Sequence, residues 1–307
     1  MVACGSSASF QWTQPETSGV DILFVVDASG SMVEEQQILA SGFTSFIHEM
    51  GSADFRIGVV SSDIDSDNPD RGKLVGDPPY LTPIDDFIPL FETRVLVGTE
   101  GSDHEKGLAA ALLTVTEGAP DFARSDASLL VVIVSDEDDC SDDGKLDDRS
   151  GSACYTEYEQ LTPVIDIVEA LQATKSSAEM VQVAAIVGPK DPCDTAAEGT
   201  RYNLAAWQTA GITGDVCEAD WSHVLIDLGL SAASDRASFA VGEPLVEKHI
   251  VVLVDGTEVA WGEDDGWTWD AETCLLHFNG DAVPDRGSAI SAEGSVDKKA
   301  RPCPLAR

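Results

Sequence analysis

One carboxylate and two hydroxyls stand at alternate positions directly after an apolar run near the N-terminus. The run ends at Val26, and Asp27, Ser29 and Ser31 follow it, with Gly30 between the two serines. Carboxylate and hydroxyl oxygens are hard ligands of the kind that Mg²⁺ prefers, and a glycine lets the backbone turn tightly between them. These residues predict a metal site. The simpler interpretation is a plain turn, because Ser-Gly-Ser is also common turn chemistry.

The apolar run that precedes this motif predicts how the motif is held. Apart from Asp21, positions 20–26 hold branched and aromatic residues, and turn formers bound them. Such a run is typical of a buried strand. In an open α/β sheet, ligand-binding groups lie beyond the carboxyl ends of the strands. A second run of this kind, 128–136, ends in Asp136.

The Asp-x-Ser-x-Ser motif after a hydrophobic strand resembles the metal-ion-dependent adhesion site of von Willebrand factor type A domains, the fold of integrin inserted domains. The resemblance implies that Asp136 is the last acidic residue of the metal site. It also implies a hydroxyl shortly before a helix that starts near Gly107. Counting back places Ser102 there, with a serine in place of the usual threonine, and Thr99 is the alternative.

The resemblance further implies how the ligands divide. Ser29, Ser31 and Ser102 would contact Mg²⁺ directly, while Asp27 and Asp136 would hold it largely through water. Mn²⁺ is the expected substitute. A carboxylate from a partner protein would complete the octahedron.

Length and composition predict a folded protein of more than one domain. The chain has 307 residues, of which 43% are hydrophobic, and this length suggests two domains. Its apolar runs are strand-sized, shorter than the roughly 20 residues of a membrane-spanning helix. The 55 acidic and 18 basic side chains give a net charge of −37. Nucleic acid is therefore excluded as a partner; a solvated acidic surface and cation binding are the remaining interpretations.

Alternating strand and helix signals predict an α/β fold, a doubly wound, mostly parallel sheet resembling a von Willebrand factor A domain. We expect an N-terminal tether over 1–19, this domain over 20–235, and a small all-β module over 236–307. Turn pairs at 255–256 and 279–280 mark hairpins in the module. Its tryptophans are expected to form its core rather than a binding surface. Further strands are expected at 55–61 and 181–187, and helices at 34–50, 84–91, 104–116, 163–173, 202–209 and 221–230.

Seven cysteines indicate an oxidising compartment. Fifteen pairings of six cysteines are possible, and nearest-neighbour pairing would close three local loops. The zinc interpretation is disfavoured because no Cys-x-x-Cys occurs and His277, near Cys274, is the only histidine within five residues of a cysteine. The six cysteines concerned are Cys140, Cys154, Cys193, Cys217, Cys274 and Cys303.

The seventh cysteine, Cys4, lies in Val-Ala-Cys-Gly, which resembles the end of a bacterial lipobox. We expect Cys4 to carry lipid and the polar residues 5–19 to act as a tether. The charged start and apolar core of a signal peptide are missing from the sequence, so either the start has been trimmed or the motif is accidental.

Two acidic clusters invite a calcium interpretation. Asp63, Asp65 and Asp67 have the spacing that opens an EF-hand, but the glycine and the glutamate that this loop requires are absent. Ca²⁺ bound differently by these loops remains possible. The second cluster, residues 137–143, is expected to surround the metal site with negative potential.

These observations predict a divalent-cation-dependent binding or adhesion protein that is not an enzyme. No nucleophile with an adjacent base is evident, and Ser29 occupies the position where an aspartyl phosphotransferase needs its second acid. The protein would be extracytoplasmic, either secreted or lipid-anchored to a bacterial outer membrane or cell surface. Its partner would present an acidic side chain. The alternative is a structural subunit of a surface layer, fibre or appendage, in which the metal only stabilises loops.

Overall fold

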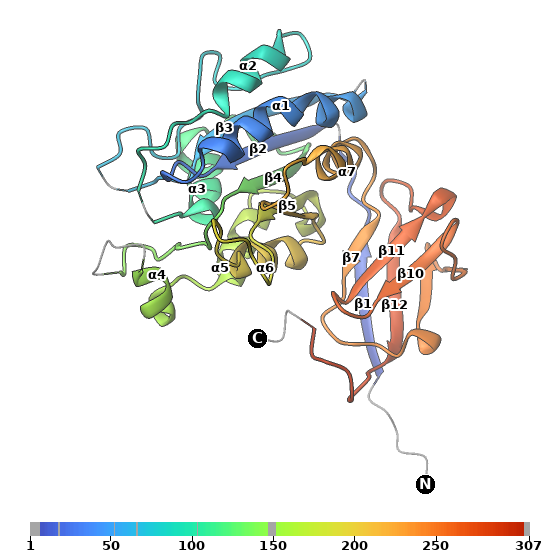
Figure 1. Cartoon of the computed structure of the whole chain (residues 1–307). Coiled ribbons are helices and arrows are strands. Elements are labelled where there is room, and N and C mark those ends of the chain that lie inside the picture. Colours follow the sequence, from blue (N-terminus) through green and yellow to red (C-terminus); the bar gives the residue numbers. More distant parts are fainter. Residues whose placement is uncertain are drawn as a thin grey trace. The chain divides into compact units, whose positions relative to one another are not determined.

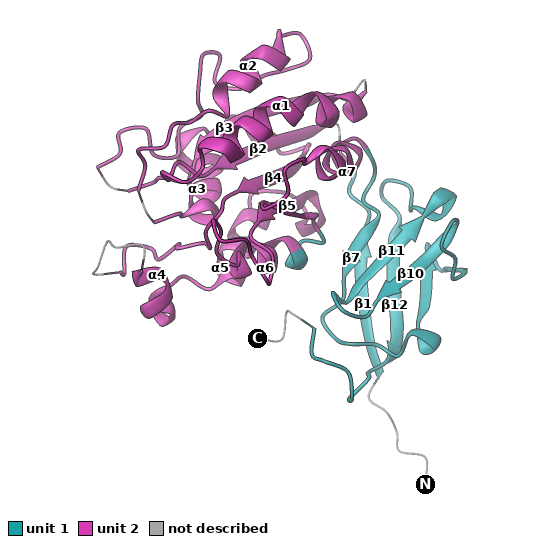
Figure 2. Ribbon diagram, viewed as in Figure 1, with its two compact units in different colours: residues 1–16, 207–210, 234–307 teal, residues 17–206, 211–233 magenta. Residues whose placement is uncertain are grey.

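The computed structural model describes residues 7–17, 19–51, 53–65, 67–102, 104–146 and 152–303. The chain divides into two compact units (Figure 2). The larger unit comprises residues 17–206 and 211–233, and the β unit comprises residues 1–16, 207–210 and 234–307. Cys4, the expected lipidation site, lies outside the described residues.

A five-stranded, all-parallel sheet forms the centre of the larger unit (Figure 1). The strand order is β3-β2-β4-β5-β6, so the chain first builds outward on one side of β2 and then returns to its other side. The direction of winding therefore changes between β2 and β4, which is where open α/β sheets form their binding crevice. The strands are β2 (Val20–Val26), β3 (Phe55–Ser61), β4 (Ser128–Val134), β5 (Val181–Val187) and β6 (Thr213–Asp215).

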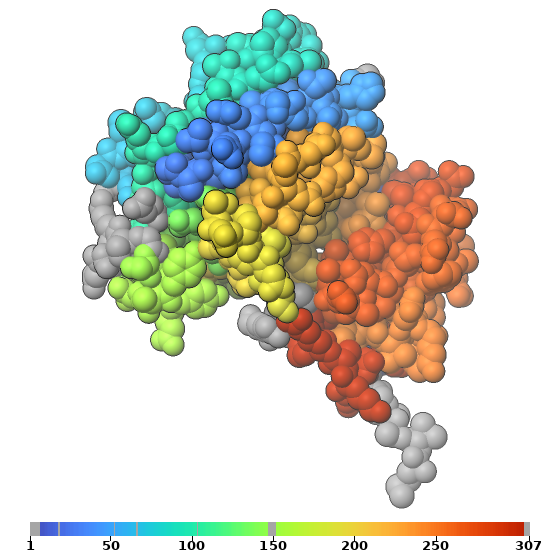
Figure 3. All heavy atoms as spheres, in the orientation of Figure 1, coloured from blue at the N-terminus to red at the C-terminus, as the bar shows by residue number. Residues whose placement is uncertain are grey.

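Helices cover both faces of this sheet because successive strand residues point to opposite sides. On β2, Phe24 packs with α1, α2 and α7, whereas Leu23 packs with α3, α5 and α6. In the space-filling view, α1 (blue) and α7 (orange) lie side by side (Figure 3). The helices are α1 (Val33–Met50), α2 (Phe87–Arg94), α3 (Gly107–Leu113) with a π-helical continuation (Thr114–Gly118), α4 (Ala153–Thr156), α5 (Val164–Gln172), α6 (Thr200–Gln208) and α7 (Ser222–Ala233), with 3₁₀ turns at Tyr158–Gln160 and Ala178–Met180.

The β unit consists of two antiparallel sheets around one hydrophobic core. One sheet has the order β1-β12-β8-β9 and the other β10-β11-β7. Trp267 is buried in the core and Trp269 packs against it, whereas Trp261 is 53% exposed. The strands are β1 (Ser7–Thr13), β7 (Ser238–Ala240), β8 (Val251–Val254), β9 (Thr257–Val259), β10 (Gly266–Asp270), β11 (Leu275–Asn279) and β12 (Ala289–Ser295), with 3₁₀ turns at Glu247–His249 and Gly280–Ala282.

The expected N-terminal tether is wrong for residues 7–13, because these residues form β1. This strand pairs along its whole length with β12, from Ser7 opposite Ser295 to Thr13 opposite Ala289. Its alternate residues Ala8, Phe10 and Trp12 pack against the core of the β unit. The N-terminal segment is thus part of the unit that the rest of the chain completes only after residue 234.

Three disulfides close the local loops that nearest-neighbour pairing predicts. They join Cys140 to Cys154, Cys193 to Cys217, and Cys274 to Cys303. None of the described helices is both long and apolar enough to cross a membrane.

Candidate metal centre

Asp27 and Asp136 lie at the carboxyl ends of the adjacent strands β2 and β4. The backbone N–H of Asp27 donates to the carbonyl of Val134 at 3.0 Å, which joins the two loops at their start. Asp27 is fully buried. Its carboxylate accepts hydrogen bonds from the Ser29 N–H at 2.7 Å and from the Ser135 hydroxyl at 2.6 Å. Sequence reasoning missed Ser135, which fixes the orientation of this carboxylate.

The two serines of the motif lie beside these acids. Their hydroxyl oxygens are 3.1 Å apart, and Ser29 is buried while Ser31 is exposed. The Ser31 hydroxyl lowers the pKa of the Asp136 carboxyl, against the larger opposing effect of burial. Four of the five predicted ligands, Asp27, Ser29, Ser31 and Asp136, are therefore brought together at one end of the sheet.

The loop between α2 and α3, here called the middle loop, reaches the same region. Its hydroxyls contact other groups. Gly101 donates its N–H to the Ala28 carbonyl at 2.9 Å, so this loop lies against the Asp-x-Ser-x-Ser loop. The Ser102 hydroxyl donates to Asp65 at 2.9 Å and accepts from the His104 N–H at 3.1 Å. Within the described ranges, neither Ser102 nor Thr99 makes a side-chain hydrogen bond to Asp27, Ser29, Ser31 or Asp136. The choice between Ser102 and Thr99 stays open.

A buried glutamine links the loop that follows β2 to the middle loop. The Gln36 side chain, from the first turn of α1, donates to the Asp27 carbonyl at 2.9 Å and to the Gly98 carbonyl at 2.8 Å. Because one amide donates to a carbonyl from each loop, it ties the two loops together.

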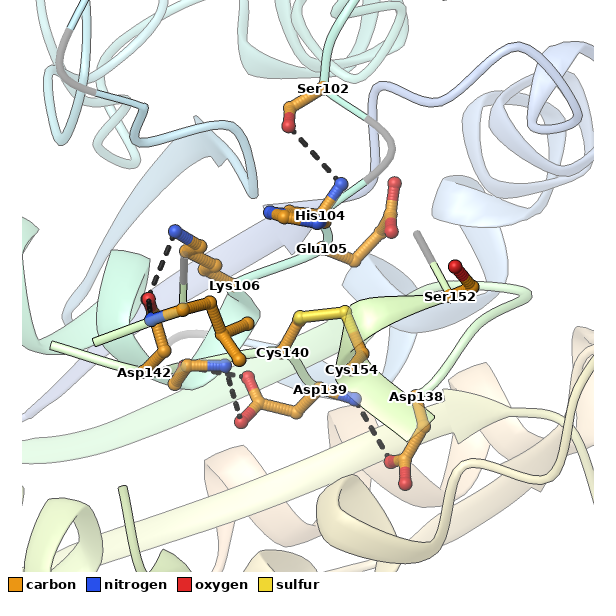
Figure 4. Close-up of a disulfide and its surroundings, with 12 residues drawn as sticks. Ser102, His104, Glu105, Lys106, Asp138, Asp139, Cys140, Asp142, Ser152 and Cys154 are labelled. Carbon is orange, nitrogen blue, oxygen red and sulfur yellow. Dashed lines mark hydrogen bonds and ion pairs between the residues drawn. A yellow bond between two sulfur atoms is a disulfide. The ribbon is translucent and has the colours of Figure 1, made fainter. Parts of the chain in front are cut away.

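Two glutamates that sequence reasoning did not assign to the metal site have carboxylates that interact electrostatically with its acids. Glu105 is 1% exposed, and its carbonyl accepts from the Cys140 N–H at 2.7 Å. Its carboxylate points away from Lys106 and from the Cys140–Cys154 disulfide (Figure 4). Glu35 follows the motif in the first turn of α1. The position of Glu35 so close to the motif was only a weak signal of a role in the metal site, because acidic residues also favour helix N-termini.

Unpartnered carboxylate oxygens are concentrated in this region. Across the described residues, three buried carboxylate oxygens lack a hydrogen-bond partner: Glu35 Oε2, Glu105 Oε1 and Asp136 Oδ1. Buried polar atoms are normally hydrogen-bonded, so such exceptions indicate a missing water or ion. The donor set of carboxylates and hydroxyls fits Mg²⁺ or Mn²⁺.

The pKa values of these acids show the same concentration of buried carboxylates. Burial, with the negative charge of Asp136, raises the pKa of Asp27 to about 7. Burial, with the charges of Asp27 and Glu137, raises the pKa of Glu105 to about 10. Burial also raises the pKa of Asp136, and burial together with Asp136 raises the pKa of Glu35. Each raised pKa reflects negative charge placed in a poorly solvated region.

The acidic residues after β4 were expected to surround the metal site with negative potential, but two of them are buried and paired with cationic side chains. Asp139 is buried and forms an ion pair with Arg201 at 3.0 Å, and it also accepts the Leu108 N–H at the start of α3. Asp142 is buried and forms an ion pair with Lys106 at 3.0 Å (Figure 4). These carboxylates are neutralised and hold α3 and α6 in place, so they contribute less field at the metal site than their number suggests.

Folding also places a histidine beside a cysteine pair that is distant in the sequence. Ligand atoms of His104, Cys140 and Cys154 lie within 4.8 Å of one another. The two sulfurs are joined in a disulfide and are therefore not thiolate ligands.

The cluster of Asp63, Asp65 and Asp67 lines an open pocket of about 980 Å³ together with residues of the middle loop. Asp63 caps the Asp65 N–H at 3.1 Å, and Asp65 also pairs with Lys106 at 3.4 Å. Ca²⁺ binding by this loop stays a prediction.

No protein-family model matches the chain, and no curated protein matches it. The solved structures similar to the chain include a von Willebrand factor type A protein from Catenulispora acidiphila, at 12% identity and a TM-score of 0.43, covering 95% of this chain and 66% of that one. The pilus adhesin SpaC from Lactobacillus rhamnosus GG has 10% identity and a TM-score of 0.40, covering 96% and 42%. Human COPII-coat protein Sec24c has 9% identity and a TM-score of 0.44, covering 94% and 41%.

The chain thus spans at most about two thirds of the length of these proteins. The strand order and the helices on both faces establish the expected α/β, doubly wound sheet directly. A von Willebrand factor type A protein is among the solved structures that this chain resembles.

Proposed function

We propose that this protein binds a divalent cation, Mg²⁺ or in its place Mn²⁺, between the loops that follow β2 and β4. The observation that carries the proposal is the set of unpartnered buried oxygens of Glu35, Glu105 and Asp136 beside the buried Asp27. A buried carboxylate without a countercharge is destabilising by several kcal/mol. A bound cation would offset that cost for several carboxylates at once.

The chain's own residues would share the work of holding the ion. The hydroxyls of Ser29 and Ser31 and the carboxylates of Asp27 and Asp136 would face it, with Ser102, or alternatively Thr99, from the middle loop. Ser135 orients Asp27 through its hydrogen bond. When bound, the cation supplies an electrophilic position that a carboxylate from outside can occupy.

We further propose that the cation mediates adhesion to a partner outside the cytoplasm. Three disulfides suit an oxidising, extracellular compartment. Two similar structures are a von Willebrand factor type A protein and a pilus adhesin, which agrees with a role at a surface or in an appendage. The partner would present an acidic side chain flanked by Lys or Arg, because the chain's net charge of −37 repels an acid alone. The role is binding rather than catalysis, and attachment through a lipidated Cys4 remains part of the proposal.

One observation favours the alternative, a structural subunit whose metal only stabilises loops. Glu35 and Glu105 bring the nearby carboxylates to four, whereas the sequence-predicted ligand set has two. More negative charge around the cation lowers its attraction for a carboxylate from a partner.

A pull-down in Mg²⁺ and in EDTA separates these roles. The immobilised protein should retain a foreign ligand in Mg²⁺ and release it in EDTA, and Asp27→Asn should retain none. Asp70→Asn is the matched control, because the Asp70 side chain is 81% exposed and forms a surface ion pair with Lys73. Capture that EDTA leaves unchanged would contradict the adhesion role and favour the structural one.

A further inference from the structure

The N-terminal strand β1 leaves one edge of a sheet open. It is the first strand in the order β1-β12-β8-β9, so β12 is its only neighbour among the described strands. Its seven residues, Ser-Ala-Ser-Phe-Gln-Trp-Thr, include no charged residue, proline or glycine. Natural proteins usually protect an open edge with charges, prolines, bulges or a very short strand. β1 has none of these, and its register with β12 is regular throughout.

The other sheet edges of the β unit are shorter or charged. β9 has three residues and carries Glu258, and β7 has three residues. β10 has five residues and ends in Asp270. β1 is therefore the edge of this unit that best fits an added strand.

The pairing with β12 determines which backbone groups of β1 face outward. Gln14 donates its N–H to Ser288 at 2.9 Å, directly beyond the strand. Since antiparallel pairs alternate between bonded and non-bonded residues, the even-numbered residues bond to β12. The odd-numbered ones, including Ser9, Gln11 and Thr13, direct their N–H and C=O groups to the open edge. In the part of the chain that the structure describes, no hydrogen bond is made to these outward backbone groups.

The aromatic residues of β1 are not fully buried. Phe10 and Trp12 stack with their ring centroids 6.1 Å apart, and Trp12 contacts Phe239 at 5.5 Å. Both nevertheless remain partly exposed at the margin of the core. A further strand beside β1 would cover this apolar surface and satisfy the outward backbone groups together.

We propose that the open edge of β1 pairs, antiparallel, with β1 of a second copy of this chain. Pairing centred on Phe10 places Ala8 opposite Trp12 and Ser9 opposite Gln11, so apolar residues meet on the inner face and polar residues on the outer face. Two copies with a net charge of −37 each repel one another, and this uncharged strand offers an edge where backbones approach without juxtaposing carboxylates. The interface is two-fold symmetric.

The pairing does not involve the metal site, so the test is made on the full chain in EDTA. Sedimentation equilibrium in 0.5 M NaCl, which screens the repulsion, should show a concentration-dependent dimer. Gln11→Pro removes an outward N–H and no bond to β12, and it should weaken dimerisation at least tenfold. Gln11→Thr keeps the N–H and should dimerise as the wild type does. Equal midpoints of thermal unfolding for the two variants exclude loss of the fold.

A charge-reversal pair tests the register without changing the backbone. Ser9→Lys with Gln11→Lys should give a monomer, as should Ser9→Glu with Gln11→Glu, and mixing the two variants should restore a heterodimer. Hydrogen exchange should slow at residues 9, 11 and 13 as concentration rises. A wild-type chain that stays monomeric, a dimer indifferent to Gln11→Pro, or outward amides protected only by a different protein would each overturn the proposal.

Discussion

Replacing the buried Glu105 by glutamine should stabilise the cation-free protein. The unfolded chain loses the proton of this carboxyl near its ordinary pKa of 4.5, whereas the folded protein, with the pKa raised to about 10, retains it. The folded state therefore binds the extra proton, and its stability falls as pH rises between these two values. A glutamine has no proton to lose, so this loss is absent in the variant.

The size of the effect follows from the difference between the two pKa values. Between them, stability changes by about 1.4 kcal/mol for each pH unit, so the interval from pH 4.5 to pH 7 represents about 3 kcal/mol. For a unit of this size, about 3 kcal/mol raises Tm by roughly 6–12 °C. The gain over wild type should be largest at high pH and should disappear near pH 4.

Thermal unfolding in EDTA between pH 4 and pH 9 measures this difference, with Glu117→Gln as the control because Glu117 is exposed. Saturating Mg²⁺ should narrow the difference, since a bound cation stabilises the wild-type carboxylate but not the amide. A Glu105→Gln protein that is less stable than wild type in EDTA at pH 7 would refute the argument that this carboxylate is buried without a countercharge.

Three further outcomes are expected. Asp27→Asn should keep the fold but abolish cation binding, measured by Mn²⁺ titration, whereas Asp27→Ala should also lose about 1–3 kcal/mol of stability because two hydrogen-bond donors lose their acceptor. Arg201→Met should lower the free energy of unfolding by about 3–5 kcal/mol, measured by urea denaturation, because it leaves Asp139 buried without its ion pair; an unchanged midpoint would contradict that pairing. Under denaturing, non-reducing conditions, thiol labelling should find at most one reactive cysteine, and peptide mapping should join Cys140 to Cys154; three or more free thiols would argue against the oxidising compartment.

The sequence predicted the parts of the fold whose cause is local. The strands β3 and β5 have the expected bounds, and β4 lies within the expected run 128–136, because continuous runs of branched apolar residues have few alternatives to a buried parallel strand. The helix expected at 104–116 begins only at Gly107. The residues before it form a buried loop, whose Glu105 is fixed by contacts with Cys140 and Tyr202 that no local pattern contains.

What sequence reasoning missed depends on partners far along the chain. The local sequence of β1 resembles a polar tether, and only its pairing with a strand about 280 residues later makes it part of a sheet. The sequence predicts an exposed acidic cluster after β4, because no residue near Asp139 in the sequence indicates its ion pair with Arg201. The number of acids near the metal site was underestimated for the same reason.

Calorimetric titration of the full chain with Mg²⁺ and Mn²⁺ tests the central claim most directly. The wild type and Asp70→Asn should each bind one cation at this site, with weaker binding at low pH because the raised pKa values of Asp27 and Asp136 protonate the ligands first. Asp136→Asn should lose that binding while unfolding cooperatively. Equal cation affinity in the wild type and in Asp136→Asn would contradict the assignment of a metal centre between β2 and β4.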